Sequence, residues 1–191
     1  MRSSFRRLAL AALVLTVTAV APARAEDFKV DPAHSSVSFK AGHLGLAWVH
    51  GRFNQFSGEF TLDKEAPAKS SFTLTVAADS VDTNNAARDR HLKSPDFFNA
   101  NQFPKITFKS TSVKAVPGGY QVTGDFTMHG AKKAITFTLK GGREAEFPKG
   151  TRRTGFSTEL TLKRSDFGMN KFTQAISDEI HVSISFEGTK K

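Results

Sequence analysis

The chain has 191 residues, no cysteine and a formal net charge of +9. Without cysteine there are no disulfides, so stability must come from a packed core, and the length suffices for one domain. The basic residues occur as scattered pairs, such as Lys132-Lys133 and Lys163-Arg164, and not as a tract, which argues against nucleic acid as a partner.

Residues 1–25 have the features of a secretory signal peptide. Arginines without acids precede a small apolar run over residues 8–20, and Ala23-Arg24-Ala25 offers small residues where a signal peptidase cleaves. We expect export, cleavage after Ala25 and a mature domain of residues 26–191 with 23 basic and 18 acidic residues. An uncleaved membrane anchor is the alternative, but the run is shorter than the ~20 residues that a membrane-spanning helix needs.

Eight segments alternate apolar and polar residues, as half-buried antiparallel strands do. In chain order they are Val37 to His43, Val49 to Leu62, Phe72 to Ala78, Ile106 to Ser110, Tyr120 to Met128, Ile135 to Leu139, Phe156 to Leu162 and Ile180 to Phe186. The second segment changes parity near Asn54-Gln55, which predicts a bulge, and Gly141-Gly142 predicts a turn.

Eight antiparallel strands in series predict an all-β fold, a single closed up-and-down barrel. A two-sheet sandwich is the main alternative. The opposite parity carries polar residues such as Lys40, Thr107 and Ser183, so this face is expected to contact water. An outer-membrane barrel has the reverse arrangement, so we expect no stable membrane insertion.

The inward face mixes large aromatic residues with small ones. The expected channel wall consists of Phe39, Ala41, His43, Phe60, Phe72, Leu74, Val76, Phe108, Val122, Phe126, Phe137 and Phe156. Small inward residues such as Ala78 and Gly124 can leave an apolar channel that holds one ligand, or can make room for neighbouring rings in a filled core. Alternation alone does not separate these two interpretations.

One connection, residues 82–104, is too long for a hairpin turn, and loops of this length usually have a function or structure of their own. The residues after Asn84 and Asn85 favour a short helix, which we expect to cap one end of the barrel. The entrance is then expected to be formed by Arg90, His91, Leu92, Phe97 and Phe98. The basic residues would face a polar or anionic headgroup while the rings cover the channel. Alternatively, the rings only seal the core.

The residue pattern predicts no catalytic residue, no bound metal and no cofactor. The histidines, at positions 34, 43, 50, 91, 129 and 181, form no HxH or HxxxH pair. The chain has no GxSxG motif and no carboxylate pair in an evident acid–base setting, so a hydrolase is kept only as an alternative.

An ordered set of motifs resembles the YceI-like family of bacterial lipid-binding proteins across essentially the whole mature chain. The motifs are DPAHSSVSF (31–39), GHLG (42–45), HGRF (50–53), RDRHLKSPDFF (88–98), FPKITFKS (103–110), MHGAKKAITFTL (128–139), RSDFGMN (164–170) and SDEIHVSISFEG (177–188). Phe28 is a small departure, because the family often has tryptophan there.

The resemblance implies an extended eight-stranded antiparallel barrel of lipocalin-like shape, usually in the periplasm. It also implies a carrier that holds a polyisoprenoid, an isoprenoid quinone or a fatty-acid-like lipid inside the barrel. An envelope stress or interaction protein with a packed core and no ligand is the alternative. Homodimer formation and a membrane partner for lipid or quinone delivery stay open.

Overall fold

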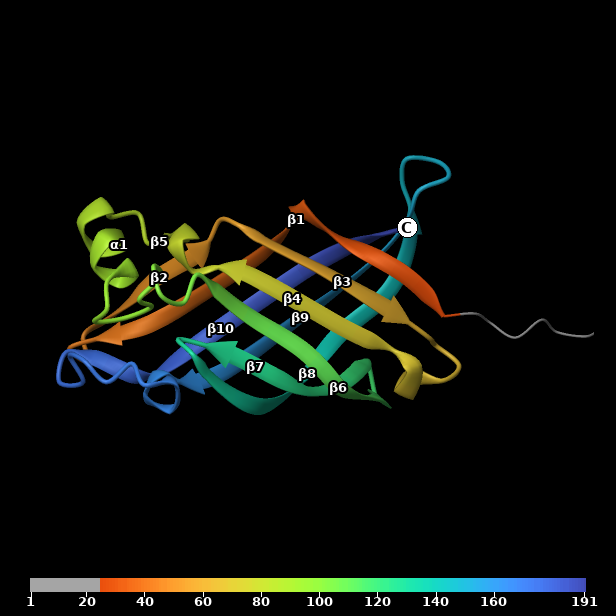
Figure 1. The fold of residues 1–191 in the computed structure, drawn as a ribbon. Helices are drawn as coiled ribbons and strands as arrows, with labels where there is room; N and C mark the ends of the chain where they lie inside the picture. Colours follow the sequence, from red (N-terminus) through yellow and green to blue (C-terminus); the bar gives the residue numbers. More distant parts are fainter. Residues whose placement is uncertain (1–24) are drawn as a thin grey trace, which may run out of the picture.

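Ten strands account for most of residues 25–191, the part of the chain that the computed structural model describes (Figure 1). In chain order they are β1 (Glu26–His43), β2 (Ala47–Phe53), β3 (Phe56–Leu62), β4 (Ser71–Ala77), β5 (Val81–Asp82), β6 (Lys105–Val116), β7 (Gly119–Met128), β8 (Ala131–Glu146), β9 (Arg152–Lys163) and β10 (Ile176–Lys190). The predicted signal peptide lies, but for Ala25, outside the described residues.

Helical structure is sparse in this part of the chain. It comprises one α-helix, α1 (Ala86–Lys93), and the short 3-10 helices η1 (Pro67–Lys69), η2 (Ala78–Ser80) and η3 (Arg164–Phe167). No helix among the described residues is both long and apolar enough to cross a membrane.

The long strands close into a barrel. Each pairs antiparallel with its neighbour, and β10 pairs back with β1 from Phe28↔Lys190 to His43↔Ile176. β2 and β3 pair with different halves of β1 and together count as one of the eight strands of the barrel. The two-residue strand β5 pairs only with the end of β2. The predicted eight-stranded up-and-down barrel is therefore confirmed. The sandwich alternative is wrong, because the pairing of β1 with β10 leaves no open seam between two sheets.

The predicted bulge at Asn54-Gln55 is a full break between β2 and β3. η2 satisfies the backbone groups at this break. The Asn54 N–H donates to the Ser80 carbonyl and the Gln55 N–H to the Ser80 hydroxyl, each at 3.1 Å. A parity change in the sequence thus marks the point where the chain shifts from one half of β1 to the other.

Several strands run further than the alternation indicated, among them β1, β6, β8 and β10. β1 begins at Glu26, and a register shift between Asp31 and Ser36 hides its continuity from a period-2 pattern. The turn predicted at Gly141-Gly142 is wrong. Both glycines lie within β8 at a register shift toward β9, with φ angles of 122° and 90°. Glycine adopts such angles at little steric cost, so the pair forms a bulge.

The two ends of the barrel differ. At the end away from α1, which we call the closed end, five phenylalanine rings pack with centroids 4.9 to 5.8 Å apart: Phe28, Phe60, Phe72, Phe156 and Phe186. Stacked and edge-on contacts of this length add stability beyond the burial of the rings. At the other end, which we call the mouth, α1 and the connection between β9 and β10 lie beside the strand ends (Figure 1).

Candidate functional site

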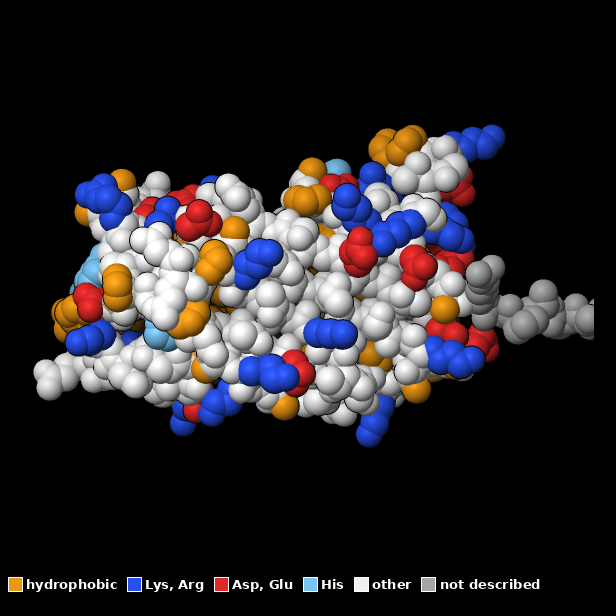
Figure 2. Space-filling view, viewed as in Figure 1, with side chains coloured by type: hydrophobic (Ala, Val, Ile, Leu, Met, Phe, Trp, Pro, Cys, Tyr) orange, Lys and Arg blue, Asp and Glu red, His pale blue; other side chains and the backbone are white. Residues whose placement is uncertain are grey.

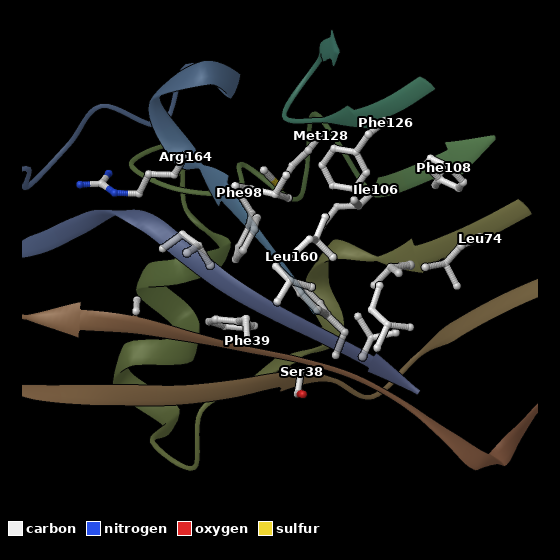
Figure 3. A pocket seen from close by; sticks show the side chains of 18 of the residues that line it. Ser38, Phe39, Leu74, Phe98, Ile106, Phe108, Phe126, Met128, Leu160 and Arg164 are labelled. Atoms are coloured by element: carbon white, nitrogen blue, oxygen red, sulfur yellow. The ribbon is translucent and has the colours of Figure 1, made fainter. Parts of the chain in front are cut away.

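The barrel holds a cavity of about 500 Å³ in its interior (Figure 3). Inward residues of all the long strands line it, together with α1 and the connection between β9 and β10, and the lining is almost entirely apolar. The volume lies within the ~300–1,000 Å³ typical of small-molecule sites. This interior is therefore hollow and not filled by its own side chains.

Most residues predicted for the channel wall line this cavity. They are Phe39, Ala41, His43, Phe60, Phe72, Leu74, Val76, Phe108, Phe126 and Phe137. Val122 and Phe156, predicted for the same wall, instead pack in the core at the closed end. Alternation tells which face of a strand a residue occupies but not how far along the barrel it lies. It therefore could not separate residues that line the cavity from residues that pack at the closed end.

The small inward residues divide in the same way. Ala41 lines the cavity, whereas Ala78 is buried in η2 and does not. A side chain at Gly124 would collide with the Lys109 carbonyl and the Phe108 ring. Gly124 thus makes room for the Phe108 ring. The cavity is lined by other small residues, such as Ala41.

α1 forms the expected cap at the mouth. The Asn85 side chain accepts a hydrogen bond from the Arg88 N–H at 3.0 Å, which satisfies a free donor of the first helical turn. Thr83 then ties the helix to the barrel. Its N–H and hydroxyl donate to Asp89 at 2.9 and 2.6 Å, while Arg88 donates to its hydroxyl and carbonyl, both at 2.7 Å.

Four of the predicted entrance residues line the cavity: His91, Leu92, Phe97 and Phe98. Arg90 does not. It is exposed outside the lining, and Arg88 on the same helix lines the cavity instead. Residues two apart on a helix face different directions, so one basic residue can turn inward only if the other turns away.

Residues 164–175, between β9 and β10, form a second part of the mouth that sequence reasoning did not identify. Met169, Phe172 and Ala175 from this segment line the cavity. The Phe172 ring stacks on Phe97 at 5.7 Å and meets the His91 ring edge-on at 5.3 Å, so the two caps touch. The length of this segment was the signal that sequence reasoning missed, because only residues 82–104 were treated as a long connection.

Arg164 organises this second segment. Only 3% of it is exposed, and its guanidinium donates to the carbonyls of Met169 (2.6 Å), Lys171 (2.7 Å), Ser177 (3.0 Å) and Ile176 (3.1 Å). Burial lowers the pKa of the guanidinium, which the charge of Asp178 partly opposes. Arg164 also lines the cavity, but in Figure 3 its guanidinium points away from the labelled apolar side chains, so its charged end serves the loop.

Thr158 is a polar exception in the wall. It lies on β9, is 4% exposed, and its hydroxyl oxygen has no hydrogen-bond partner among the described residues. A buried hydroxyl without a partner costs free energy, so its presence in an apolar wall is notable.

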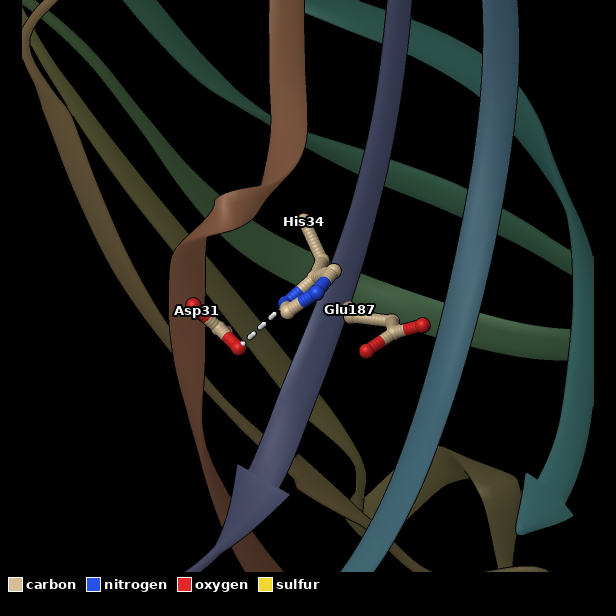
Figure 4. A group of neighbouring side chains, drawn as sticks. All are labelled: Asp31, His34 and Glu187. Atoms are coloured by element: carbon tan, nitrogen blue, oxygen red, sulfur yellow. Dashed lines mark hydrogen bonds and ion pairs between the residues drawn. The ribbon is translucent and has the colours of Figure 1, made fainter. Parts of the chain in front are cut away.

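A group of possible metal ligands lies on the outer face of the barrel (Figure 4). Ligand atoms of Asp31, His34 and Glu187 all lie within 4.8 Å of one another, and His34 Nδ1 is 2.8 Å from Asp31 Oδ2. Arg153 already donates to Asp31 at 2.9 Å and to Glu187 at 3.0 Å. Its guanidinium thus supplies the positive charge that a metal would bring, and we read the group as an ion-pair network that ties β1, β9 and β10.

A closed barrel with a hollow apolar interior and a capped mouth defines the class of ligand-binding β-barrels. The model of the YceI-like domain matches residues 28–188. A UPF0312 protein of Pseudomonas aeruginosa is 38% identical over 188 residues, 97% of this chain and 98% of that protein. The chain belongs to the YceI-like family.

Solved structures agree with this assignment. The Campylobacter jejuni YCEI protein is 32% identical, with a TM-score of 0.70 over 78% of this chain and 90% of that one. A structure described as a polyisoprenoid binding domain from Saccharophagus degradans has a TM-score of 0.66 and covers 86% of this chain and 98% of that one. At 17% identity, the second likeness shows the fold alone.

Proposed function

We propose that the protein is a carrier that holds one long-chain amphiphile, of the polyisoprenoid, isoprenoid quinone or fatty-acid-like class, inside the barrel. The observation that carries the proposal is the apolar cavity of about 500 Å³, lined by rings such as Phe39, Phe108 and Phe137. Burial of a hydrocarbon chain contributes roughly 0.8 kcal/mol per CH₂, so an apolar wall suffices for affinity without many polar contacts.

We propose that the polar end of the ligand lies at the mouth. The closed end is filled by packed rings, whereas the mouth carries Arg88 and His91 in the cavity lining. A headgroup there stays near water while the chain runs toward the closed end. The description of a structure of the same fold as a polyisoprenoid binding domain is in line with this ligand class.

We place the carrier in the periplasm, after export and removal of residues 1–25. The arginine-rich start, the short apolar run and the small residues before Glu26 support this proposal. Determination of the N-terminal residue of the protein in its own host tests it: Glu26 is expected, and Met1 in a membrane fraction would contradict it.

Native mass spectrometry of the protein purified from its own host tests the carrier role. We expect the mass of the chain plus one lipid, with the bare chain appearing after organic extraction. Ala41→Phe fills the cavity and should lower lipid occupancy severalfold while overpacking costs roughly 1–3 kcal/mol of stability. Ala134→Phe is the matched control, because Ala134 is exposed on β8.

Either of two results contradicts the carrier role. One is a protein that never carries lipid and does not take up a long-chain prenol after purification. The other is full lipid occupancy in a folded Ala41→Phe variant, since the ligand would then lie outside the cavity. The first result would favour the interaction-protein alternative.

A further inference from the structure

The mouth has an apolar rim that the ligand cavity does not require. Large hydrophobic side chains that are exposed among the described residues number five, and four of them lie at this end: Leu46 (83% exposed), Leu44 (56%), Trp48 (49%) and Phe172 (48%). The fifth, Phe147 (76%), lies in the turn between β8 and β9 at the other end. In Figure 2 hydrophobic side chains reach the surface beside Lys and Arg at the end that holds α1.

The rim is continuous with the entrance. The Leu44 N–H donates to the Ala175 carbonyl at 2.7 Å, which joins the β1–β2 turn to the β9–β10 connection. Phe172 belongs to both features: half of it is exposed, and it also lines the cavity against Phe97. A surface that contacts this rim would therefore contact the opening through which a ligand leaves.

Backbone strain marks the same two tips. Leu44 has φ of 53° and Phe172 has φ of 57°, a left-handed conformation that is uncommon for bulky side chains and that Asn or Gly adopts more easily. Leu44 precedes Gly45 in the β1–β2 turn, where Asn is the usual residue. Strained residues of this kind tend to cluster at functional sites, so two apolar ones at exposed tips point to a role outside the fold.

Basic side chains lie at the same end as the rim. Lys40 Nζ lies 4.8 Å from the centre of the Trp48 ring. Arg90, Lys93 and Lys171 have no side-chain ion pair within the described part of the chain.

Acidic side chains lie at this end too, but none of them forms an ion pair with these three cations. Asp89 accepts hydrogen bonds from Thr83, Asp178 from Ser165, and Asp96 lies 3.0 Å from His91. The mouth therefore presents apolar tips together with three cations that have no ion pair among the described residues.

We propose that the mouth docks on an anionic lipid bilayer, with Leu44, Leu46 and Phe172 entering the headgroup region and Trp48 at its boundary. Exposed apolar tips gain from burial among acyl chains, and each Lys or Arg near an anionic surface adds attraction. Trp48 suits the boundary because indole rings concentrate at membrane–water interfaces. The proposal does not depend on which amphiphile the cavity holds.

The chain itself supplies the reporter for the test, because Trp48 is its only tryptophan. The purified chain from Glu26 onward, which contains every strand of the barrel, is mixed with vesicles of phosphatidylglycerol and phosphatidylcholine. We expect a blue shift of Trp48 fluorescence, quenching by brominated lipid, and co-sedimentation that weakens with salt and in vesicles of pure phosphatidylcholine.

Variants locate the contact. Leu46→Ser should weaken vesicle binding by about tenfold, and Lys171→Ser by about fivefold. Phe147→Ser is the matched control, an exposed aromatic at the far end, and should bind as the unaltered protein does. Leu44→Asn should bind more weakly yet unfold at higher denaturant, because Asn relieves the strain. A purely structural role for Leu44 predicts lower stability instead.

Three outcomes would overturn the proposal. The first is a Trp48 spectrum unchanged by anionic vesicles. The second is equal loss of binding in Leu46→Ser and Phe147→Ser. The third is burial of Trp48 in a dimer or in a protein complex without vesicles. None of these bears on whether lipid occupies the cavity, so the carrier role is tested separately by mass spectrometry.

Discussion

The closed end and the mouth contain the same kinds of residues, but the first is filled by packed side chains and the second opens on the cavity. At the closed end, Phe28 and Phe156 are buried in the packed cluster of rings and do not line the cavity. At the mouth, Phe97 and Phe172 also stack, yet Phe172 stays half exposed and both rings face a cavity. Aromatic residues therefore do not by themselves mark a binding site. A ring belongs to the site only where it also lines the cavity.

The two ends are also held together by different interactions. Strand ends at the closed end are held by ion pairs, such as that of Arg153 with Asp31, in addition to the packed rings. The mouth is held by hydrogen bonds from a few side chains, chiefly those of Arg164 and Thr83. Buried side chains such as Phe97, Ala100 and Phe167 also pack at the mouth, but this end is covered by connecting segments and not by paired strands, and such segments open at a lower free-energy cost.

The largest effect on stability is expected when a ring is removed from the phenylalanine cluster at the closed end. Phe60→Ala removes the ring that touches Phe28, Phe72, Phe156 and Phe186, and should cost roughly 3–5 kcal/mol of unfolding free energy. Denaturant titration measures this change. Phe172→Ala at the mouth is the comparison and should cost about 1 kcal/mol or less. Equal losses in the two variants would mean that the ends are packed alike.

Arg164→Met comes next. It leaves four buried or half-buried carbonyls without their donor, so we expect a loss of roughly 2–4 kcal/mol together with faster hydrogen exchange over residues 168–177. Arg164→Lys keeps the charge but not the planar guanidinium, so its stability should lie between those of the unaltered protein and Arg164→Met. Exchange that stays unchanged in this segment would show that the loop does not depend on Arg164.

The ion pairs of the closed end predict a smaller, pH-dependent effect. Hydrogen bonds from His34 and then Arg153 lower the pKa of Asp31 from 3.8 to about 2. Because the pKa is lower in the folded state, the stability from this carboxylate is present above pH 3.8 and is lost as the pH falls toward 2.

The variant Asp31→Asn tests this linkage. It should have a lower denaturant midpoint at pH 7 and a shallower loss of stability on acidification than the unaltered protein. An identical dependence of the midpoint on pH in both proteins would place the acid-sensitive group elsewhere.

The smallest effect has the opposite sign. Thr158→Val replaces an unpartnered buried hydroxyl by a methyl group of similar size, and should raise the stability of the lipid-free barrel by about 1 kcal/mol. Thermal unfolding of lipid-free protein measures it. A loss of stability would mean that the hydroxyl has a partner that the apolar wall conceals, such as a bound water.

Period-2 alternation was enough to predict the barrel, because each strand of a closed barrel must place one parity inside. It also placed Phe39 and Phe137 on the wall correctly. It failed for Val122 and Phe156, since depth along the barrel depends on strand tilt and register, which no single strand encodes.

The mouth was harder to predict than the wall. Residues 82–104 stood out by length, and the helix cap at Asn85 could be read from residue type. Arg90 was misplaced because the entrance residues were chosen without regard to the helical turn, which separates Arg90 from Arg88. Phe172 and Arg164 were missed because their roles arise from contacts with other parts of the chain and not from any local pattern.

We propose that the ligand enters at the mouth and that the other end of the barrel stays sealed. Hydrogen exchange of the lipid-free and lipid-loaded protein, mapped by mass spectrometry, tests it most directly. We predict that loading slows exchange in α1, around Phe97 and in residues 164–176, while the strand ends near Phe28 and Phe186 exchange alike in both states. Slower exchange at the closed end with an unchanged mouth would mean that the ligand does not enter at the mouth.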